Sequence, residues 1–313
     1  MVTMGKLALV TGAAGFIASN VVDSLLEKGY EVIGLDRARK PRPCFDDYLQ
    51  SMQYTYVQSD ISRQDDIFHN MSGVDIVYHM AANSNIRVSG IDPTIDFDST
   101  LKTTERVLEA MRRNEVGKIF FPSSSAVYGS RRGLLAEDSG NLSPISYYGA
   151  CKLSSEALIS SYSHMNGIDA LIFRLANVIG PDMTHGVIYD LVKKLKEDPN
   201  RLQVLGNGAQ RKQYVHIDDL KEGIIGFSER ISQGVSTYNI STRSSIDVRE
   251  IVSIILEKTG LDPEVEYTGG ESGWNGDVPS YELDISKAVA DGWNYRYDSK
   301  EAVEKTLDVL CEE

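Results

Sequence analysis

Short apolar segments alternate with helical stretches through the first 175 residues, and this feature constrains the fold more than any other. Such alternation is typical of a parallel sheet whose strands are joined by crossover helices. Residues 16–26 carry an apolar stripe at helical spacing, and Gly29 follows as a stop signal. The stretch 37–50 contains Pro41 and Pro43 and is expected to be a loop. The expected strands cover residues 6–10, 31–35, 54–57, 74–79, 117–121 and 168–174.

The rhythm changes beyond residue 175, where Gly and Pro become frequent and the strand-like pieces are short and scattered. The expected fold is therefore α/β, a Rossmann-type doubly wound parallel sheet with a smaller C-terminal α/β substrate lobe. The larger domain is expected to cover residues 1–175 plus about 217–240, because a helix and a strand near 218–240 return to it. The smaller lobe would use about 176–216 and 241–313.

Charge and cysteine content narrow the possible partners. The net charge is -13 and basic residues form no long run, so a nucleic-acid partner is not expected. Cys44, Cys151 and Cys311 lie far apart in the sequence and leave an odd thiol, which predicts a reducing compartment and no metal site. No segment is apolar enough to span a bilayer, so a cytoplasmic protein without a membrane partner is expected.

A glycine-rich turn follows the first expected strand and opens a helix. Gly12 permits a tight turn, and Gly15 lets the backbone approach a pyrophosphate. Phe16 and Ile17 begin the helix, whose first N-H groups are free to bind an anion. The strand-turn-helix context predicts a dinucleotide-binding loop, although a merely tight connection would show the same glycines.

Asp36 ends the second expected strand, 24 residues after Gly12. A carboxylate there accepts hydrogen bonds from an adenosine ribose and repels a 2'-phosphate, which favours NAD over NADP. The nearby basic residues Arg37, Arg39 and Lys40 keep NADP open. Further cofactor contacts are expected where the third and fourth strands end, at Asp60, Ile61, Ala81 and Ala82.

A hydroxyl-rich strand end and the next helix carry the candidate catalytic residues. Ser123, Ser124 and Ser125 follow the fifth expected strand, and Tyr148 and Lys152 lie four residues apart on a helix, so they share a face. The tyrosine pKa must fall by about three units for it to act as a base, which requires about 4 kcal/mol. An ammonium about 5 Å away supplies about 3 kcal/mol at an effective dielectric constant of about 20, and an oxidised nicotinamide adds more. Taken alone, the Tyr-Lys spacing also fits an exposed helix surface.

The chain closely resembles the extended short-chain dehydrogenase/reductases, and within them the UDP-glucose 4-epimerase group of NAD-dependent epimerase/dehydratases. The resemblance extends over nearly the whole length. It implies an NAD-binding Rossmann domain followed by a UDP-sugar-binding lobe. The motifs that carry it are Thr11–Ala18, His79–Ala82, Ser123–Gly129, Tyr148–Lys152, Arg174–Pro181, Gly206–Gln210 and Tyr214–Asp219.

The resemblance also implies roles for single residues. Ser124 would be the catalytic serine and Tyr148 the base, both touching the substrate, while Lys152 would support the base and hold the nicotinamide ribose. Asn177 would contact the diphosphate, and Leu205 would lie beside uracil. The remaining implied substrate contacts are Lys212 in place of the family's phosphate-binding arginine, Arg211 as its possible substitute, Asp277 on a ribose and Tyr281 at a gate that disfavours N-acetylated sugars.

The implied function is an NAD-dependent UDP-glucose/UDP-galactose 4-epimerase of galactose metabolism, which keeps NAD tightly bound and acts through a 4-keto intermediate. Dehydratases of the family carry an Asp-Glu pair where this chain has Ser125 and Ala126. Two alternatives stay open, a UDP-N-acetylhexosamine or UDP-uronate 4-epimerase and a catalytically silent NAD-binding regulator. The expected partners are a UDP-sugar and a second copy of the chain, because relatives pair through helices matching 95–114 and 146–166.

Overall fold

The structure of the chain, a computed structural model, describes residues 5–41, 45–63, 65–84, 90–270, 278 and 280–312. The chain divides into two compact units, which are described separately. Unit 1 comprises Met1–Val127, Tyr147–Arg174 and Lys221–Thr237. Unit 2 comprises Tyr128–Ser146, Leu175–Leu220 and Tyr238–Glu313.

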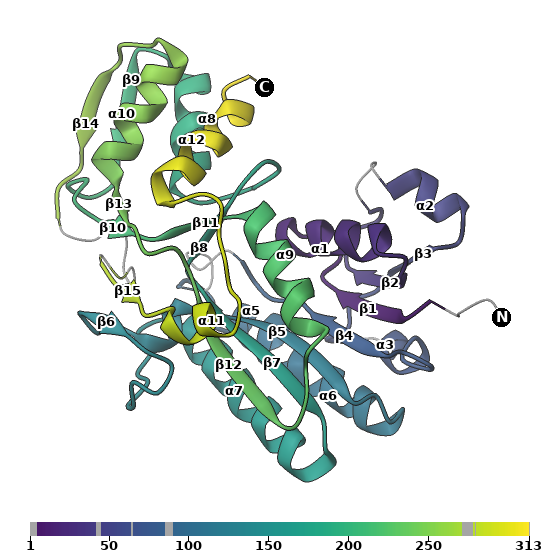
Figure 1. Ribbon diagram of the computed structural model, residues 1–313. Coiled ribbons are helices and arrows are strands. Elements are labelled where there is room, and N and C mark those ends of the chain that lie inside the picture. Colours follow the sequence, from purple (N-terminus) through teal and green to yellow (C-terminus); the bar gives the residue numbers. More distant parts are fainter. Residues whose placement is uncertain are drawn as a thin grey trace. The chain divides into compact units, whose positions relative to one another are not determined.

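Unit 1 is built on a seven-stranded parallel sheet with the strand order β12-β7-β5-β4-β1-β2-β3 (Figure 1). The order reverses between β1 and β4, the feature that defines a doubly wound sheet and locates its ligand crevice. The strands are β1 (Leu7–Thr11), β2 (Glu31–Asp36), β3 (Tyr54–Gln58), β4 (Ile76–His79), β5 (Lys118–Ser124), β7 (Asp169–Leu175) and β12 (Val235–Ile240). The helices are α1 (Phe16–Glu27), α2 (Asp46–Gln50), α3 (Asp66–His69), α5 (Thr94–Asp96), α6 (Lys102–Arg113), α7 (Tyr147–Asn166) and α9 (Ile217–Ser228), with a π-helical turn at Phe97–Leu101 and a 3-10 turn at Ser125–Tyr128.

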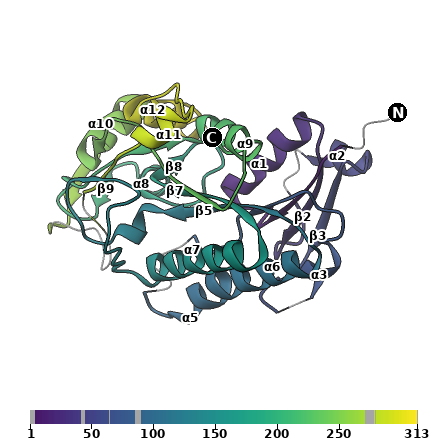
Figure 2. The same ribbon diagram turned by 60° about the horizontal axis from the view of Figure 1, so that its bottom comes forward.

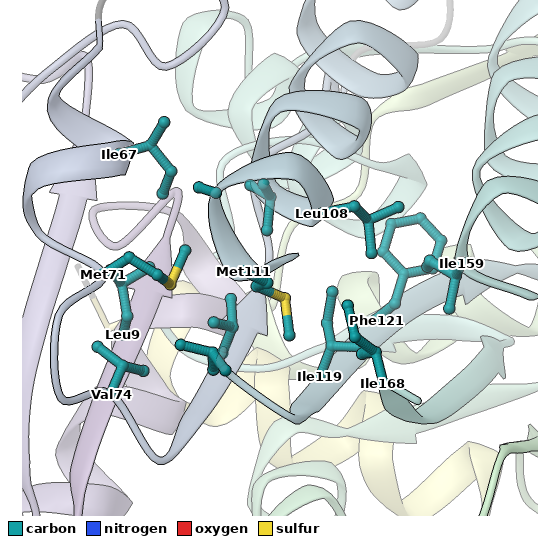
Figure 3. Close-up of a cluster of buried hydrophobic side chains, with 14 of the residues drawn as sticks. Leu9, Ile67, Met71, Val74, Leu108, Met111, Ile119, Phe121, Ile159 and Ile168 are labelled. Carbon is teal, nitrogen blue, oxygen red and sulfur yellow. The ribbon is translucent and has the colours of Figure 1, made fainter. Parts of the chain in front are cut away.

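Helices cover both faces of this sheet, with α1 on one face and α6 and α7 on the other (Figure 2). The central strands are rich in β-branched and aromatic residues and are buried on both faces, as parallel strands require. Between the sheet and α3, α6 and α7 lies a large apolar cluster, in which Leu108 and Ile159 from the helices surround Phe121 of β5 (Figure 3). Burial of this cluster drives the helices onto the sheet and holds α7 against β5.

Each of the six strands expected from the apolar segments is present, within a few residues of its expected bounds. The prediction of a loop over residues 37–50 was wrong at its end, because Asp46–Gln50 forms α2. Phe45, at 1% exposure, packs edge-on against Tyr54 with ring centroids 5.3 Å apart, and this contact anchors the start of the helix. Both prolines precede the helix, so neither interrupts it.

Unit 2 combines short two-stranded sheets with longer helices (Figure 1). Two helices begin with a complete capping box, Asp247 with Glu250 and Asp298 with Glu301, which satisfies their first N-H groups. The strands are β6 (Leu134–Leu135), β8 (Asn177–Ile179), β9 (Arg201–Val204), β10 (Arg211–Lys212), β11 (Tyr214–His216), β13 (Ile246–Asp247), β14 (Glu264–Tyr267) and β15 (Glu282–Leu283). The helices are α8 (Val187–Glu197), α10 (Val248–Thr259), α11 (Ser286–Ala290) and α12 (Ser299–Leu310).

The segment Tyr128–Ser146 belongs to unit 2, whereas the sequence places it in the larger domain. Its strand β6 pairs in parallel with β15, far along the chain. The Tyr128 hydroxyl also donates to Asn239 Oδ1 at 2.7 Å, and the Asn239 N-H donates to Glu137 at 2.7 Å. These long-range contacts, which sequence periodicity does not reveal, explain the different boundary.

Membrane spans, metal-ligand clusters and free thiols were sought in the described ranges. No helix within them is both long and apolar enough to cross a membrane. Within the same ranges, no three His, Cys, Asp or Glu side chains gather as ligands for a metal ion. Cys151 and Cys311 carry free thiols.

Candidate active site

The strand-order reversal of unit 1 is held by a buried histidine. His79 lies at the end of β4. Its Nδ1 is hydrogen-bonded to the Thr11 hydroxyl of β1 at 2.8 Å, and its Nε2 is hydrogen-bonded to the Thr104 hydroxyl of α6 at 3.0 Å. Because the Thr104 hydroxyl proton goes to the Thr100 carbonyl, Nε2 must donate and Nδ1 must accept. Burial and the nearby Lys152 lower the pKa of His79 to about 3, so the imidazole is neutral. The network therefore joins β1, β4 and α6 through an uncharged group.

The glycine-rich turn lies directly at this reversal and fits the pyrophosphate of NAD. Gly12 has a φ of +68°, and a Cβ there would lie 2.9 Å from the Cα of Ala81. Gly15 is the N-cap of α1 and provides no side chain to cap it, while the first turn contains no acidic residue. The N-H groups of Phe16 and Ile17 therefore face no competing side-chain oxygen at this helix end, which suits a bound anion.

Asp36 lies at the end of β2 with its carboxylate fixed by the backbone. Oδ2 accepts from the N-H of Ala14 at 3.0 Å, and Oδ1 accepts from the N-H of Ala38 at 2.8 Å. These bonds tie the carboxylate to the glycine-rich turn, where the adenosine ribose of NAD is expected, and each oxygen keeps a further lone pair. Arg37 and Arg39 are exposed. The geometry thus fits an unphosphorylated ribose.

The other expected cofactor residues lie at ends of neighbouring strands. Asp60, after β3, accepts from the Ser62 hydroxyl at 2.6 Å, and its pKa is lowered by that bond and by Arg37 against the effect of burial. Ile61 is buried, with 5% exposure. Ala81 and Ala82 follow β4 and are half-buried, and the Ala81 N-H donates to Thr11 Oγ1 at 3.1 Å.

The three candidate catalytic residues come together in unit 1. Ser124 is the last residue of β5, and its hydroxyl hydrogen-bonds to Tyr148 in the first turn of α7. Lys152, one turn later, is 3% exposed, and its Nζ donates to the Pro122 carbonyl at 2.7 Å. The same Nζ lies 5.8 Å from the centroid of the Tyr148 ring and 4.6 Å from that of Phe121. The i, i+4 spacing thus places phenol and amine together, as the sequence predicts.

The pKa values of this pair differ from the expected lowering of the tyrosine. Burial raises the pKa of Tyr148 to about 12, with a smaller increase from Asp96 and an opposing effect from the Ser124 hydrogen bond. Burial also lowers the pKa of Lys152 to about 7, although Glu156 and Asp96 oppose this. A buried amine near neutrality is a weaker cation than the full ammonium assumed from sequence. An oxidised nicotinamide, when bound, would supply further positive charge to stabilise the phenolate.

A buried ion pair that was not predicted from the sequence links α7 to β7. Glu156 lies one turn after Lys152. Arg174 of β7 donates to its carboxylate from Nη2 at 2.8 Å and from Nε at 3.1 Å. The Ser123 hydroxyl of β5 donates to the same carboxylate. Glu156 and Arg174 side chains are 8% and 7% exposed. The regular spacing of Tyr148, Lys152 and Glu156 along one helix face was the signal that could have revealed it.

In unit 2, the expected substrate residues lie on several short elements. Asn177 begins β8, and its Nδ2 is buried without a hydrogen-bond partner in the described part of the chain. An unpaired buried amide is costly, so it suits a ligand oxygen. Leu205 follows β9 and is half-buried, and Tyr281, beside β15, is 7% exposed. Asp277 lies outside the described residues.

The two basic residues of β10, Arg211 and Lys212, lie in different environments. Arg211 Nη2 contacts Asp247 and Glu250, each at 2.7 Å, and Nη1 donates to the Ser245 carbonyl at 2.8 Å. The guanidinium therefore anchors β10 to the start of α10, and a phosphate would have to compete with two carboxylates. Lys212 is half-buried and, as the next residue in a strand, points to the opposite face. The assignment of Lys212 to a phosphate stays a prediction.

A doubly wound sheet with a glycine-rich turn at its reversal, and a Tyr-Lys pair on the helix after β5, defines a dinucleotide-dependent protein of the short-chain dehydrogenase/reductase class. The model of the NAD-dependent epimerase/dehydratase family matches residues 8–241. The chain belongs to this family, and its cofactor is NAD. Within the family it is an enzyme of the epimerase type.

Similar proteins cover nearly the whole chain. A Methanocaldococcus jannaschii protein, whose name assigns it provisionally as a UDP-glucose 4-epimerase, is 32% identical over 308 residues, which are 96% of this chain and 97% of that protein. A solved UDP-galactose 4-epimerase is 33% identical with a TM-score of 0.85, covering 98% of this chain and 99% of that one. The Bacillus cereus UDP-glucuronic acid 4-epimerase, solved with UDP-glucuronic acid and NAD, is 27% identical with a TM-score of 0.86 and the same coverage. Their names agree on 4-epimerisation and differ in the sugar.

Proposed function

We propose that this protein is a 4-epimerase that interconverts UDP-glucose and UDP-galactose with Ser124, Tyr148 and Lys152 as its catalytic residues. The observation that carries the proposal is the meeting of Tyr148 with Ser124 and Lys152 at the carboxyl end of β5. Carboxyl ends of strands near the order reversal are where doubly wound sheets bind their ligands. The likeness to proteins named as epimerases of UDP-glucose and UDP-galactose supports this choice of sugar.

Each catalytic side chain has one task in the proposed reaction. Tyr148 Oη takes the proton of the sugar 4-hydroxyl, and Ser124 holds the same oxygen by a hydrogen bond. Lys152 supplies positive charge beside the phenol and keeps it in place through its bond to the Pro122 carbonyl. Bound NAD supplies a reversible hydride acceptor for C4 of the sugar. After the 4-keto sugar turns over, Tyr148 returns the proton to the same oxygen, so no proton is gained or lost.

The nucleotide part of the substrate is proposed to be held by residues of unit 2. The unpaired amide of Asn177 and the cation of Lys212 suit a diphosphate, and Leu205 offers an apolar surface for uracil. Arg211 is left out of this proposal, because its guanidinium is already paired with two carboxylates. Ser125 and Ala126 provide no acid-base pair for dehydration, which favours simple epimerisation.

The direct test incubates purified protein with UDP-galactose and measures UDP-glucose as product. Parallel reactions with UDP-N-acetylgalactosamine and UDP-glucuronic acid decide between the proposed substrate and the two alternatives. Conversion of UDP-galactose as the best substrate is expected. A preference for another sugar would replace the substrate, and no turnover of any UDP-hexose would support a silent NAD-binding regulator.

A matched pair of tyrosine variants tests the catalytic assignment. Tyr148→Phe removes the proton acceptor and should lower kcat by a factor of about 10² to 10⁴ while NAD stays bound. Tyr147→Phe changes a neighbour whose side chain is 52% exposed and should leave kcat unchanged. Equal activity of the two variants would contradict the assignment of Tyr148 as the base.

A further inference from the structure

Asp96, at the carboxyl end of α5, is a fully buried carboxylate beside the catalytic helix. Its exposure is 0%. Oδ1 accepts from Nδ2 of Asn83 at 2.8 Å, while Oδ2 is buried and has no hydrogen-bond partner among the residues that the structure describes. A carboxylate buried with an unpaired oxygen is costly, so its retention calls for a physical reason.

The surroundings of Asp96 suggest that reason. The α5 segment and the π-helical turn after it pack against α7, and the carboxylate acts electrostatically on Tyr148, Cys151 and Lys152 of that helix. The other ionisable groups near Lys152 are Glu156, which is paired with Arg174, and neutral His79. Asp96 is therefore the carboxylate near the catalytic pair that no described cation neutralises by direct contact.

Two simpler roles fit the geometry less well. Asp96 is fully buried, so it cannot touch a substrate or cofactor without a movement of the chain. A purely structural link to Asn83 needs one oxygen acceptor, which a neutral side chain could provide without the cost of a buried charge. What remains specific to a carboxylate is its charge, whose effect on neighbouring groups is stronger in the protein interior than in water.

We propose that Asp96 is a positioning residue whose buried negative charge keeps Lys152 protonated and sets the pH at which the Tyr148-Lys152 pair loses its proton. This inference rests on the proposed function, because it takes Tyr148 and Lys152 as the reacting pair. The charge opposes loss of a proton from either member, so its sign is the same whichever of the two titrates. Without it, the pair would deprotonate at lower pH.

The test variant is Asp96→Asn, which removes the charge and keeps an oxygen for Asn83. The acid limb of the kcat/KM profile should move to lower pH by up to about one unit, the order of effect that a nearby unit charge has at an effective dielectric constant of about 20. Asp98→Asn is the matched control, because Asp98 lies in the same segment with its side chain 48% exposed and 3.7 Å from Lys102. Water should screen that change, and the limb should stay in place.

Cys151 provides a second readout that does not depend on activity. Burial and Asp96 raise the pKa of this thiol to about 11, so removal of the Asp96 charge should lower it. In a background of Cys44→Ser and Cys311→Ser, alkylation of Cys151 at fixed pH should become about two- to fivefold faster in Asp96→Asn, because the gain in thiolate is partly offset by its lower nucleophilicity. Asn83→Ala removes the hydrogen bond but keeps the carboxylate, and it should give neither the faster alkylation nor the lower acid limb.

The outcomes separate this inference from the proposed function. Shifts of both the acid limb and the alkylation rate in Asp96→Asn, absent from Asp98→Asn and Asn83→Ala, would support it. An unmoved acid limb or an unchanged alkylation rate would overturn it, as would equal shifts in Asn83→Ala. If the unaltered protein converts no UDP-sugar, the proposed function fails, and the alkylation rate alone decides whether the Asp96 charge reaches α7. Asp96→Ala serves as a second neutral variant if asparagine is not accommodated.

Discussion

Glu156→Gln should destabilise unit 1 more than its conservative appearance suggests. The substitution neutralises the carboxylate that pairs with Arg174 at 2.8 Å, with both side chains less than one-tenth exposed. Arg174 then keeps its charge in a buried position, because a guanidinium has no neutral form near neutral pH. The amide oxygen of glutamine still accepts one hydrogen bond, so part of the contact survives.

The expected loss in the free energy of unfolding is about 3 kcal/mol, the lower end of the range for breaking a buried ion pair. For a domain of this size class, that corresponds to a decrease in Tm of roughly 6–12 °C. The matched control is Glu266→Gln, which breaks the Arg201–Glu266 pair at 2.6 Å, whose side chains are 61% and 46% exposed. An exposed pair of this kind contributes less than about 1 kcal/mol.

Urea unfolding, with hydrogen exchange of α7 and β7 amides to assign the loss to unit 1, measures both variants. The double variant Glu156→Gln/Arg174→Met removes both charges and should recover most of the lost stability, because the stranded charge is gone. Equal midpoints for Glu156→Gln and Glu266→Gln would refute the reasoning. A double variant less stable than Glu156→Gln would show that the cost comes from lost packing rather than from the unpaired guanidinium.

Three further predictions follow from the sites described above. Gly12→Ala should lower the affinity for NAD and destabilise the fold by about 1–3 kcal/mol, because the new Cβ would lie 2.9 Å from the Cα of Ala81 at a φ of +68°. Calorimetric titration with NAD measures the affinity, and urea unfolding measures the stability. An unchanged affinity would contradict the prediction. Burial lowers the pKa of Lys152 in the folded protein from 10.5 to about 7, so between these pH values the unfolded state binds more protons. The free energy of unfolding of the original protein should therefore rise relative to that of Lys152→Met as pH rises from 7 to 10.5. Parallel curves of unfolding free energy against pH would contradict this. Tyr281→Cys should raise kcat/KM for UDP-N-acetylgalactosamine relative to UDP-galactose if Tyr281 is the gate that the family resemblance implies. An unchanged ratio in a coupled assay would remove that role.

The fold of unit 1 could be predicted from sequence because its signals are local. Buried parallel strands give continuous apolar runs, and the crossover helices give stripes at helical spacing, so β1 to β5 and α7 were located within a few residues. The short α2 was missed, since its anchor is the contact of Phe45 with Tyr54 on β3 rather than a pattern within the helix. The segment Tyr128–Ser146 lies in another compact unit than the domain that the sequence predicts for it, because β6 pairs with a strand nearly 150 residues away.

The candidate site could be predicted where chemistry coincides with a spacing rule. Tyr148 and Lys152 follow the i, i+4 rule, and Asp36 follows from its place after Gly12. Asp96 carries no such signal, because an aspartate in a short helix usually faces water and its burial appears only in three dimensions. The sequence also does not report desolvation, which is the largest cause that raises the pKa of Tyr148.

The histidine at the strand-order reversal also has a mechanical consequence. His79 contacts Thr11 before the cofactor turn and Thr104 on α6, and Thr104 in turn meets Ser155 of α7 at 3.1 Å. Since hydrogen bonds tolerate only small displacements, a shift of α7 along its axis would strain β1 and the glycine-rich turn that follows it. One neutral ring, which acidification within the physiological range leaves unchanged, thereby couples the glycine-rich turn to the helix of the proposed base.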